Sequence, residues 1–418
     1  MATPTEPARP ASPERRPELD AIRMLVVIGL VFFHSALVFA DGDDYYVKNA
    51  ETTEAVLIAA GFAVVWAMPL LFLVSGLGAW HSLHRRGPGG FAKERLLRLG
   101  VPLVFATLVL NPLPQWLRLR SADAGHRESY LGFLPRFYDV DLAPAEFPFL
   151  LRGEYFETGH LWFVVLLLAF SLMLAPLVRW LPREQVRHIG DRLAHAVLHR
   201  RGAVLLPALA FAAVCAFARM EQEYAGWHHW AYLLFFVAGF TLAADDRFRV
   251  VVRREAGLAA WLGVVLFAAS GPGFVLADEP MTEATVLATA SRALFGAAGW
   301  CLVLAIPGLL DRRRHRRPPT APDSAPDLAP DLAPDLAPDP VPRMRRRLRR
   351  HLAAAVLPLY VLHQPVVVAV AYFVVGRSAP IPVKYAVLVT IALALTLALY
   401  ELLVRRTRTT RFLFGMRS

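Results

Sequence analysis

Two ionisable residues in the first long apolar stretch are spaced so that they could act together. Arg23 and His34 form an R-x10-H spacing, which equals about three turns of a helix. Both side chains would then lie on nearly the same helix face, about 16 Å apart along the helix axis. The pair fits a reaction whose donor is bound at one depth and reacts at another. Arg23 would hold a phosphate-bearing donor at the cytoplasmic opening of the site (its mouth), and His34 would act as a base near the middle of the membrane. The alternative is a snorkelling arginine and a histidine that hydrogen-bonds to a neighbouring helix.

Other polar residues fall at matching positions. Arg95 and Arg98 form an R-x-x-R element before the third apolar stretch and would add positive charge at the same mouth, unless they are ordinary basic flanks of a membrane helix. His363 is expected at about the same depth as His34. Pro365 follows it and should kink that helix, freeing backbone groups for a site.

Three further residues are weaker candidates for a site. An ionisable side chain within a membrane helix is costly, which makes it a functional hypothesis by default. Arg292, together with His363, is therefore a candidate for the lining of a pore. His160 and Trp162 are candidates for the outer, acceptor side. No metal-ligand spacing is present, and we expect no metal ion.

Composition indicates what kind of molecule positions these residues. Of 418 residues, 56% are hydrophobic and only 19% are charged, and the mean hydropathy is +0.43. So little charge excludes a soluble globular enzyme and a disordered chain, and it indicates a polytopic membrane protein. The net charge of +11 is expected to lie in cytoplasmic loops rather than to bind nucleic acid.

Hydropathy and loop charge predict the topology. Each spanning helix needs about 20 mostly apolar residues. The candidate spans are 22–40, 55–80, 97–113, 160–180, 202–219, 227–244, 256–277, 284–310, 352–375 and 382–404. The loops between them alternate between basic and acidic. We therefore expect an all-α integral membrane protein of about ten transmembrane helices with both termini cytoplasmic.

The chain divides into one membrane domain and polar extensions. The predicted segments are a disordered cytoplasmic tail (1–18), helices one to eight (19–310), a disordered cytoplasmic linker rich in Arg and Pro-Asp (311–350), and helices nine and ten with a basic tail (351–418). Repeated APD tetrapeptides within the linker forbid a helix there. The outer loop 114–159 is rich in aromatic residues, which would either anchor it at the membrane surface or roof a cavity. Ser75-Gly76 is expected to let two helices pack closely.

Several short motifs, in order, resemble membrane acyltransferase family 3, and within it the glucan biosynthesis protein C branch. The resemblance covers about residues 19 to 417. Its motifs are LDAIR at 19–23, FFHS at 32–35, FLVSG at 72–76, RLLRLGVP at 95–102, GHLWF at 159–163, YVLHQP at 360–365 and LYELL at 399–403. Leu77 departs from the pattern, because an aromatic residue usually follows Ser-Gly.

The resemblance implies an integral membrane O-acyltransferase of the bacterial plasma membrane. Such an enzyme moves an acyl group from cytoplasmic acyl-coenzyme A to a hydroxyl of an extracytoplasmic acceptor, such as a glycan or another envelope molecule. Arg23 and His34 would be the essential pair, with His34 acting as general base or relaying the acyl group. Arg23, Arg95 and Arg98 would hold the coenzyme A phosphates. Acyl-coenzyme A is then a substrate rather than a resident cofactor, and the acyl group can be acetyl or succinyl.

Two other functions compete with this hypothesis. A transporter of an anionic solute would use Arg23, Arg292 and His363 along its pathway without any chemistry. A non-catalytic membrane scaffold would instead use the arginine-rich loop and the Pro-Asp linker to bind partners.

Overall fold

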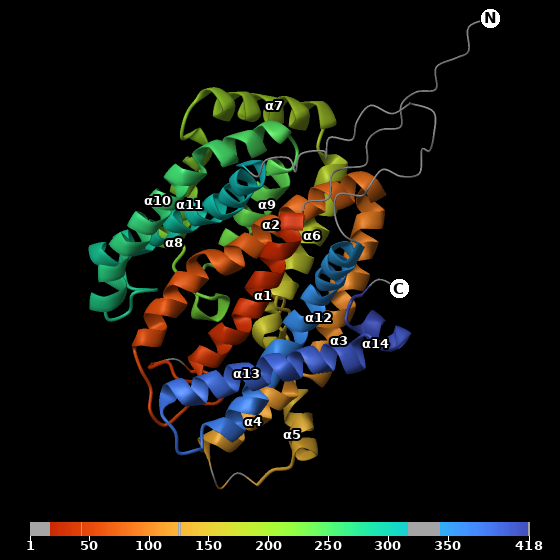
Figure 1. The fold of residues 1–418 in the computed structure, drawn as a ribbon, viewed down its shortest axis with the longest axis vertical. Coiled ribbons are helices and arrows are strands. Elements are labelled where there is room, and N and C mark those ends of the chain that lie inside the picture. The colour runs from red at the N-terminus through yellow and green to blue at the C-terminus, as the bar shows by residue number, and fades with distance from the viewer. Residues whose placement is uncertain (1–16, 43, 124, 126, 317–342, 417–418) are drawn as a thin grey trace, which may run out of the picture.

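The protein is a bundle of long helices (Figure 1). The computed structural model describes residues 17–42, 44–123, 125, 127–316 and 343–416. The predicted tail 1–18 lies outside these residues except for its last two, which begin α1. The Pro-Asp repeats of the linker also lie outside them.

Helices account for most of the described residues. In chain order the helices of six or more residues are α1 Pro17–Leu37, α2 Ala55–Arg95, α3 Val101–Val109, α4 Pro112–Ala122, α5 Tyr130–Phe137, α6 Trp162–Trp180, α7 Arg183–His199, α8 Ala208–Phe217, α9 His229–Leu242, α10 Asp246–Leu276, α11 Val286–Arg316, α12 Arg343–Val374, α13 Ile381–Leu399 and α14 Arg408–Leu413. The strands β1 Asp141–Leu142 and β2 Leu151–Arg152 pair antiparallel. The all-α class is therefore confirmed.

Seven helical segments among the described residues are long and apolar enough to cross a membrane. Two shorter apolar helices, Ala203–Phe217 and His229–Leu242, accompany them. One of the seven, Ala59–Ala122, contains most of the second predicted span and all of the third. Each of the ten predicted ranges is mainly helical, whereas ten crossings and cytoplasmic termini remain predictions.

The backbone bends within this long second segment. Gly87 has φ +69° and ψ 170°, so two helices meet inside α2 at this residue. A left-handed φ of this kind favours glycine, and Pro88 follows directly. In Figure 1 the orange ribbon rises along α2 and returns through α3 and α4.

Close helix packing confirms the interpretation of Ser75-Gly76. A Cβ atom built on Gly76 of α2 would lie 2.0 Å from the Phe236 carbonyl oxygen of α9. A Cβ atom on Gly239 of α9 would lie 2.0 Å from the Leu73 carbonyl oxygen. The two backbones therefore touch, and only glycine fits at either position.

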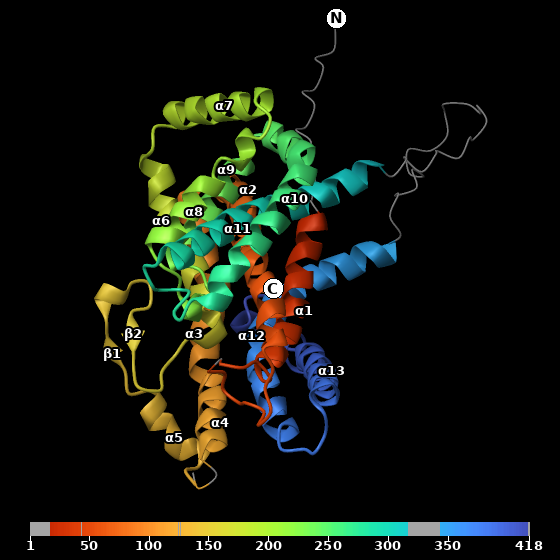
Figure 2. The same cartoon turned by 90° about the vertical axis from the view of Figure 1, so that its left-hand side faces the viewer.

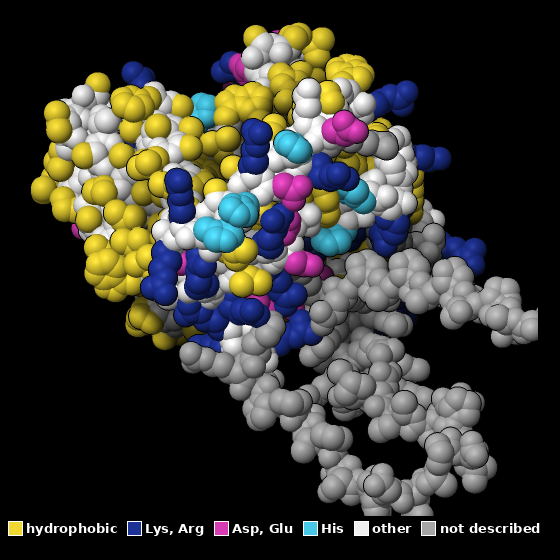
Figure 3. Space-filling view, turned by 90° about the horizontal axis from the view of Figure 1, so that it is seen from above, with side chains coloured by type: hydrophobic (Ala, Val, Ile, Leu, Met, Phe, Trp, Pro, Cys, Tyr) yellow, Lys and Arg dark blue, Asp and Glu magenta, His cyan; other side chains and the backbone are white. Residues whose placement is uncertain are grey.

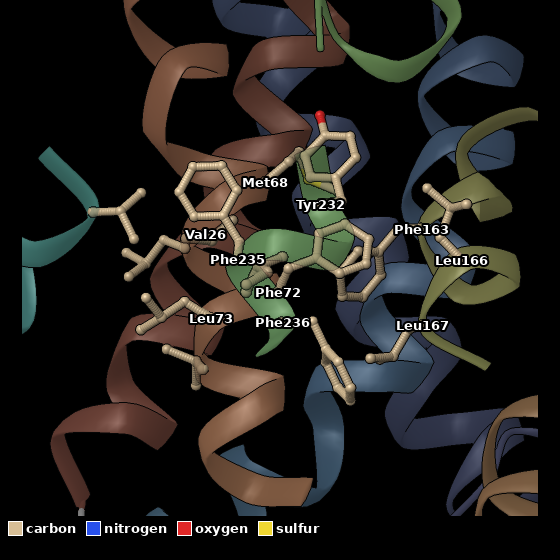
Figure 4. Packing of buried hydrophobic residues seen from close by; sticks show 14 of the residues in the cluster. Val26, Met68, Phe72, Leu73, Phe163, Leu166, Leu167, Tyr232, Phe235 and Phe236 are labelled. Carbon is tan, nitrogen blue, oxygen red and sulfur yellow. The ribbon is translucent and has the colours of Figure 1, made fainter. Parts of the chain in front are cut away.

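The main core is built around aromatic rings from α2, α6 and α9 (Figure 4). The ring of Phe72 lies 4.6 Å from that of Tyr232 and 4.7 Å from that of Phe163. A second, smaller cluster joins α1, α12 and α13. The functional residues described below lie in and between these two clusters.

The predicted outer loop 114–159 has a structure of its own. It includes most of α4, the helix α5 and the β1–β2 hairpin. Phe133 and Phe137 are fully buried, and the ring of Phe137 lies 5.5 Å from that of Phe156. These aromatic side chains pack on one another, and the two predicted roles of the loop, anchoring at the membrane surface and roofing a cavity, remain predictions.

Charged side chains gather at one end of the bundle. Figure 2 shows α7 across this end, with the hairpin and α5 lying toward the other, and Figure 3 shows many Lys and Arg side chains on the face seen from above. Arg247 of α10 pairs with Asp191 of α7 at 2.7 Å. Arg314 near the end of α11 pairs with Glu18 near the start of α1 at 3.1 Å. The start of α1 and the end of α11 therefore meet on the same side.

The helices on either side of the linker are longer than expected. α11 continues to Arg316 and α12 begins at Arg343, so both helices reach into the range 311–350. Arginine is a good helix former, which explains why basic runs extend these helices.

Candidate active site

Three histidines from distant parts of the chain meet inside the bundle. His34 comes from α1, His363 from α12, and His160 from the turn that begins α6. The ring centroid of His363 lies 5.1 Å from that of His34 and 5.0 Å from that of His160. His363 is therefore in the middle of this histidine cluster, and its side chain is fully buried.

The position of the proton on His363 follows from its neighbour. Nδ1 lies 2.5 Å from the Tyr360 carbonyl oxygen. A carbonyl oxygen can only accept, so Nδ1 carries the hydrogen. The other nitrogen, Nε2, is buried and has no hydrogen-bond partner among the described residues. In the neutral ring Nε2 therefore has a free lone pair.

Pro365 explains how His160 is held. Proline has no N–H to donate to the carbonyl four residues earlier, so the Val361 carbonyl has no partner from that position of the helix. His160 Nε2 donates to this oxygen at 3.1 Å. The Tyr360 hydroxyl in turn donates to the His160 carbonyl oxygen. The expectation that Pro365 frees a backbone group for a site agrees with this arrangement.

His34 faces the cluster without a fixed partner. Its Nδ1 is buried and has no hydrogen bond to any described residue. Its ring stacks on that of Tyr45, with the two centroids 6.0 Å apart. Buried polar atoms are nearly always hydrogen-bonded, so an open nitrogen here marks a place for a substrate group or a proton.

A cavity of about 140 Å³ lies beside these histidines. His34, His160 and Tyr360 form part of its wall, and Trp162 also lines it. The remaining wall comes mainly from α1 and α2. His34, His160 and Trp162 therefore line the same cavity. His363 is not among the residues that line it, but its ring lies next to those of His34 and His160.

Arg23 lies between α1 and α2 rather than in the cavity wall. Its Nη2 donates to the Val74 carbonyl oxygen at 3.0 Å, and its Nη1 lies 3.5 Å from an Asp20 carboxylate oxygen. A Cβ atom on Gly78 would lie 3.2 Å from the same Nη2. The small residue at this position makes room for the guanidinium group.

Arg95 and Arg98 share a carboxylate that the sequence analysis missed. Glu94 Oε2 lies 3.7 Å from Arg95 Nε, and Glu94 Oε1 lies 3.6 Å from Arg98 Nη1. Arg95 also lies over the ring of Phe91. Arg98 is close enough to Arg23 for the two positive charges to interact. These residues form a basic group, defined as Arg23, Arg95 and Arg98 with Asp20 and Glu94.

An unusual backbone carries Arg98. Residues Leu96–Gly100 form a short π-helix, a feature that often occurs at functional sites. Gly415, which has φ +69°, packs on it so closely that a Cβ atom would lie 2.3 Å from the Arg98 carbonyl oxygen. The C-terminal segment therefore supports the backbone of the basic group.

The structure does not bring Arg292 to the histidine cluster, and its place in a pore lining remains a prediction. Its guanidinium group is buried and lies 2.9 Å from the Pro280 carbonyl oxygen and 3.4 Å from that of Ala216. Thr289 Oγ1 is a third partner, at 3.2 Å. Arg292 thus satisfies backbone carbonyls where α8, α11 and the loop before α11 meet.

A half-buried hydrogen bond joins the segment after α1 to the segment before His160. The Tyr46 hydroxyl donates to Glu157, and Asn111 donates to the neighbouring Thr158 carbonyl oxygen at 2.8 Å. Burial raises the pKa of Glu157, although the Tyr46 hydrogen bond acts in the opposite direction. No sequence signal singled out this pair, because Tyr46 and Glu157 are far apart along the chain.

One group of metal-ligating residue types lies elsewhere in the described chain, at Glu221, His228 and His229. His228 Nδ1 accepts a hydrogen bond from the Trp230 N–H, which leaves the ring proton on Nε2, the nitrogen that faces Glu221. Glu221 also accepts from the His229 backbone and ring at 3.0 Å each. Burial raises the pKa of Glu221, but the hydrogen bonds from His229 outweigh it, so the pKa is below its ordinary value. The group fits a cap on α9 better than a metal site.

Comparison with known proteins adds one finding. A family model described as "Acyltransferase domain" matches residues 16–401. No curated protein and no solved structure matches the chain. The matched range includes the histidine cluster and the basic group.

Proposed function

Because the chain belongs to this acyltransferase family and is therefore a membrane acyltransferase, we propose that it moves an acyl group from acyl-coenzyme A to an acceptor hydroxyl. The donor is bound from the cytoplasmic side and the acceptor at the opposite face of the membrane. The acceptor is an envelope glycan or a related molecule, in keeping with the resemblance to the glucan biosynthesis protein C branch. The membrane is the bacterial plasma membrane.

The observation that carries this proposal is the pair of open nitrogens in the histidine cluster. His34 Nδ1 and His363 Nε2 both lack a hydrogen-bond partner among the described residues, and they belong to rings 5.1 Å apart. A hydroxyl group that enters the cavity meets the ring of His34, whose open nitrogen can accept its proton. A positioned base of this kind contributes about 10²–10⁴-fold to the rate.

In the proposed reaction, each bond that forms is matched by one that breaks. His34 takes the proton of the acceptor hydroxyl while the hydroxyl oxygen forms a bond to the thioester carbonyl carbon. The bond from this carbon to sulfur breaks, and the coenzyme A thiolate leaves. The thiolate then receives the proton from His34. The products are an ester and free coenzyme A thiol, and no oxidant or metal is needed.

The basic group forms the phosphate-binding end of the site, and the histidine cluster forms the reacting end. Arg23, Arg95 and Arg98 hold the coenzyme A phosphates, which displace the carboxylates of Asp20 and Glu94 from their present contacts. Arg23 and His34 are about 16 Å apart along α1. The extended arm of coenzyme A covers this distance, so the phosphates stay at the mouth while the thioester reaches the histidines.

Thiol release tests this function against solute transport. Purified protein in nanodiscs is given acetyl-coenzyme A with and without a carbohydrate extract of the cell envelope. We expect thiol release that depends on the extract, and acyl groups that become covalently attached to the extract. Uptake of a labelled anionic solute into vesicles, with no thiol release from any acyl-coenzyme A, would favour the transporter instead.

A further inference from the structure

The cavity beside His34 has an apolar wall along α1 and α2. Its apolar lining includes Gly29, Leu30, Phe33, Val64, Ala67 and Met68. None of the described residues that line it is a lysine, arginine, aspartate or glutamate. Its polar groups are the histidines and the tyrosine of the site.

The register of the two helices places the cavity level with His34. Arg23 of α1 contacts Val74 of α2, which fixes how the two antiparallel helices lie against each other. Eleven residues further along α1 is His34, and eleven residues back along α2 is Ala63, which also lines the cavity. The cavity wall runs along α1 from Leu25 to His34, so the cavity includes the reacting end of the proposed donor site and extends from there toward its phosphate end.

The volume is larger than an acetyl group requires. A cavity of about 150 Å³ in another protein holds benzene, a molecule of six carbon atoms. The 140 Å³ found here is similar. A Cβ atom on Gly29 would meet nothing within 4 Å, so the absence of a side chain at this position keeps the space open.

The described wall has no lysine or arginine to balance a negative charge. A carboxylate in an apolar space needs a partner, and without one its burial is strongly unfavourable. The nearest cation along α1 is Arg23, which is outside the wall and already contacts Asp20 and Val74. A succinyl group would place its terminal carboxylate in this space.

We propose that the cavity is the acyl-chain site, which takes an uncharged acyl group of about four to six carbon atoms and disfavours succinyl. This inference rests on the proposed function and names its donor class. Of the two acyl groups that the sequence left open, acetyl and succinyl, it disfavours succinyl.

Butanoyl- and succinyl-coenzyme A form a matched pair for the test. Their acyl groups have the same four-carbon length and differ in a terminal methyl or carboxylate. Dissociation constants of acetyl-, butanoyl- and succinyl-coenzyme A are measured by calorimetry with the purified full-length protein. Each buried methylene adds about fourfold in affinity, so butanoyl should bind about tenfold more tightly than acetyl. Succinyl should bind about tenfold or more weakly than butanoyl.

Filling the cavity supplies a second test. Gly29→Leu places a side chain in the open space and should reduce the butanoyl-to-acetyl affinity ratio from about tenfold to near one. Gly61→Leu is the matched control, because Gly61 also has open space around it but does not line the cavity. It should keep the wild-type ratio. Gly29→Ala, a smaller change, should give an intermediate ratio if Gly29→Leu does not fold.

The outcomes separate this inference from the proposed function. Succinyl binding as tight as butanoyl, or an unchanged ratio in the Gly29 variants, overturns the acyl-chain site while thiol release still supports an acyltransferase. Absence of both binding and thiol release with every donor overturns the proposed function, and the acyl-chain site with it.

Discussion

The ring of His34 on α1 lies 5.1 Å from the ring of His363 on α12. Each ring has one buried nitrogen without a hydrogen-bond partner among the described residues. Buried polar atoms are nearly always hydrogen-bonded, so two such nitrogens on neighbouring rings are unusual in a folded protein. An acceptor hydroxyl that binds beside them can donate its single hydrogen to one of these nitrogens, which links the packing of two distant helices to the chemistry.

The lone pair of His363 can be tested separately from its packing. Asparagine at this position can keep a donor near Nδ1 for the Tyr360 carbonyl, but it has no atom equivalent to Nε2. We expect His363→Asn to lower kcat by about 10²-fold or more with little change in the amount of folded protein. Thiol-release kinetics and size-exclusion profiles measure the two effects. Wild-type kcat in this variant would remove His363 from the mechanism.

The role of Pro365 predicts an indirect effect on activity. Pro365→Ala restores an N–H that competes with His160 for the Val361 carbonyl. We expect kcat/KM to fall by about tenfold while the melting temperature is unchanged or higher. Pro358→Ala is the control. Pro358 lies in the same helix as Pro365, but it leaves the carbonyl of a different residue without a helical partner. Equal losses of kcat/KM in the two variants would argue against an effect of Pro365 that acts through the hydrogen bond of His160.

The carboxylate of Glu94 should compete with the donor phosphates. Glu94→Gln removes its charge from Arg95 and Arg98. We expect KM for acyl-coenzyme A to fall about 2–5-fold at low salt, and the effect to shrink as ionic strength rises. Arg98→Ala should raise KM about tenfold. Steady-state kinetics at two salt concentrations measure both, and an Arg98→Ala enzyme with unchanged KM would place the phosphates elsewhere.

Arg292 should matter for stability and not for chemistry. Arg292→Ala leaves the carbonyls of Pro280 and Ala216 without their donor. We expect a loss of about 1–3 kcal/mol in the free energy of unfolding. The kcat per folded molecule should stay at the wild-type value. Thermal unfolding followed by intrinsic fluorescence and an activity assay on the folded fraction test this, and a large loss of kcat would return Arg292 to the site.

Glu157 predicts a dependence of stability on pH. Its pKa is raised by burial in the folded state, so folding favours the protonated form. The stability that this form contributes is present below the ordinary glutamate pKa of about 4.3 and is lost as pH rises through the folded-state pKa. Glu157→Gln mimics the protonated form. Its melting temperature relative to wild type should therefore increase by about 1–3 °C between acidic and neutral pH. If the difference in melting temperature between Glu157→Gln and wild type does not change with pH, the raised pKa of Glu157 is contradicted.

The main features of the site could be predicted because they depend on local periodicity. The spacing of Arg23 and His34 along one helix and the depth of His363 follow from the rise of an α-helix. The hydropathy of the chain likewise predicts which segments are helical.

Features that depend on contacts between distant segments could not be predicted in this way. The hydrogen bond from His160 to the Val361 carbonyl oxygen depends on how the turn that begins α6 packs against α12. The carbonyl partners of Arg292 could not be predicted, because a buried arginine in a membrane helix can serve either a site or nearby backbone carbonyls, and the sequence does not distinguish the two. Glu94 was not predicted, although it directly precedes the R-x-x-R element and its i,i+4 spacing to Arg98 is typical of an ion pair on a helix.

The most direct test of the account is His34→Ala with binding and catalysis measured on the same preparation. Calorimetry gives the dissociation constant for acyl-coenzyme A, and thiol release in the presence of the envelope extract gives kcat. The account predicts a dissociation constant close to that of wild type and a kcat lower by about 10²–10⁴-fold. A variant that binds the donor and transfers acyl groups at the wild-type rate would contradict it.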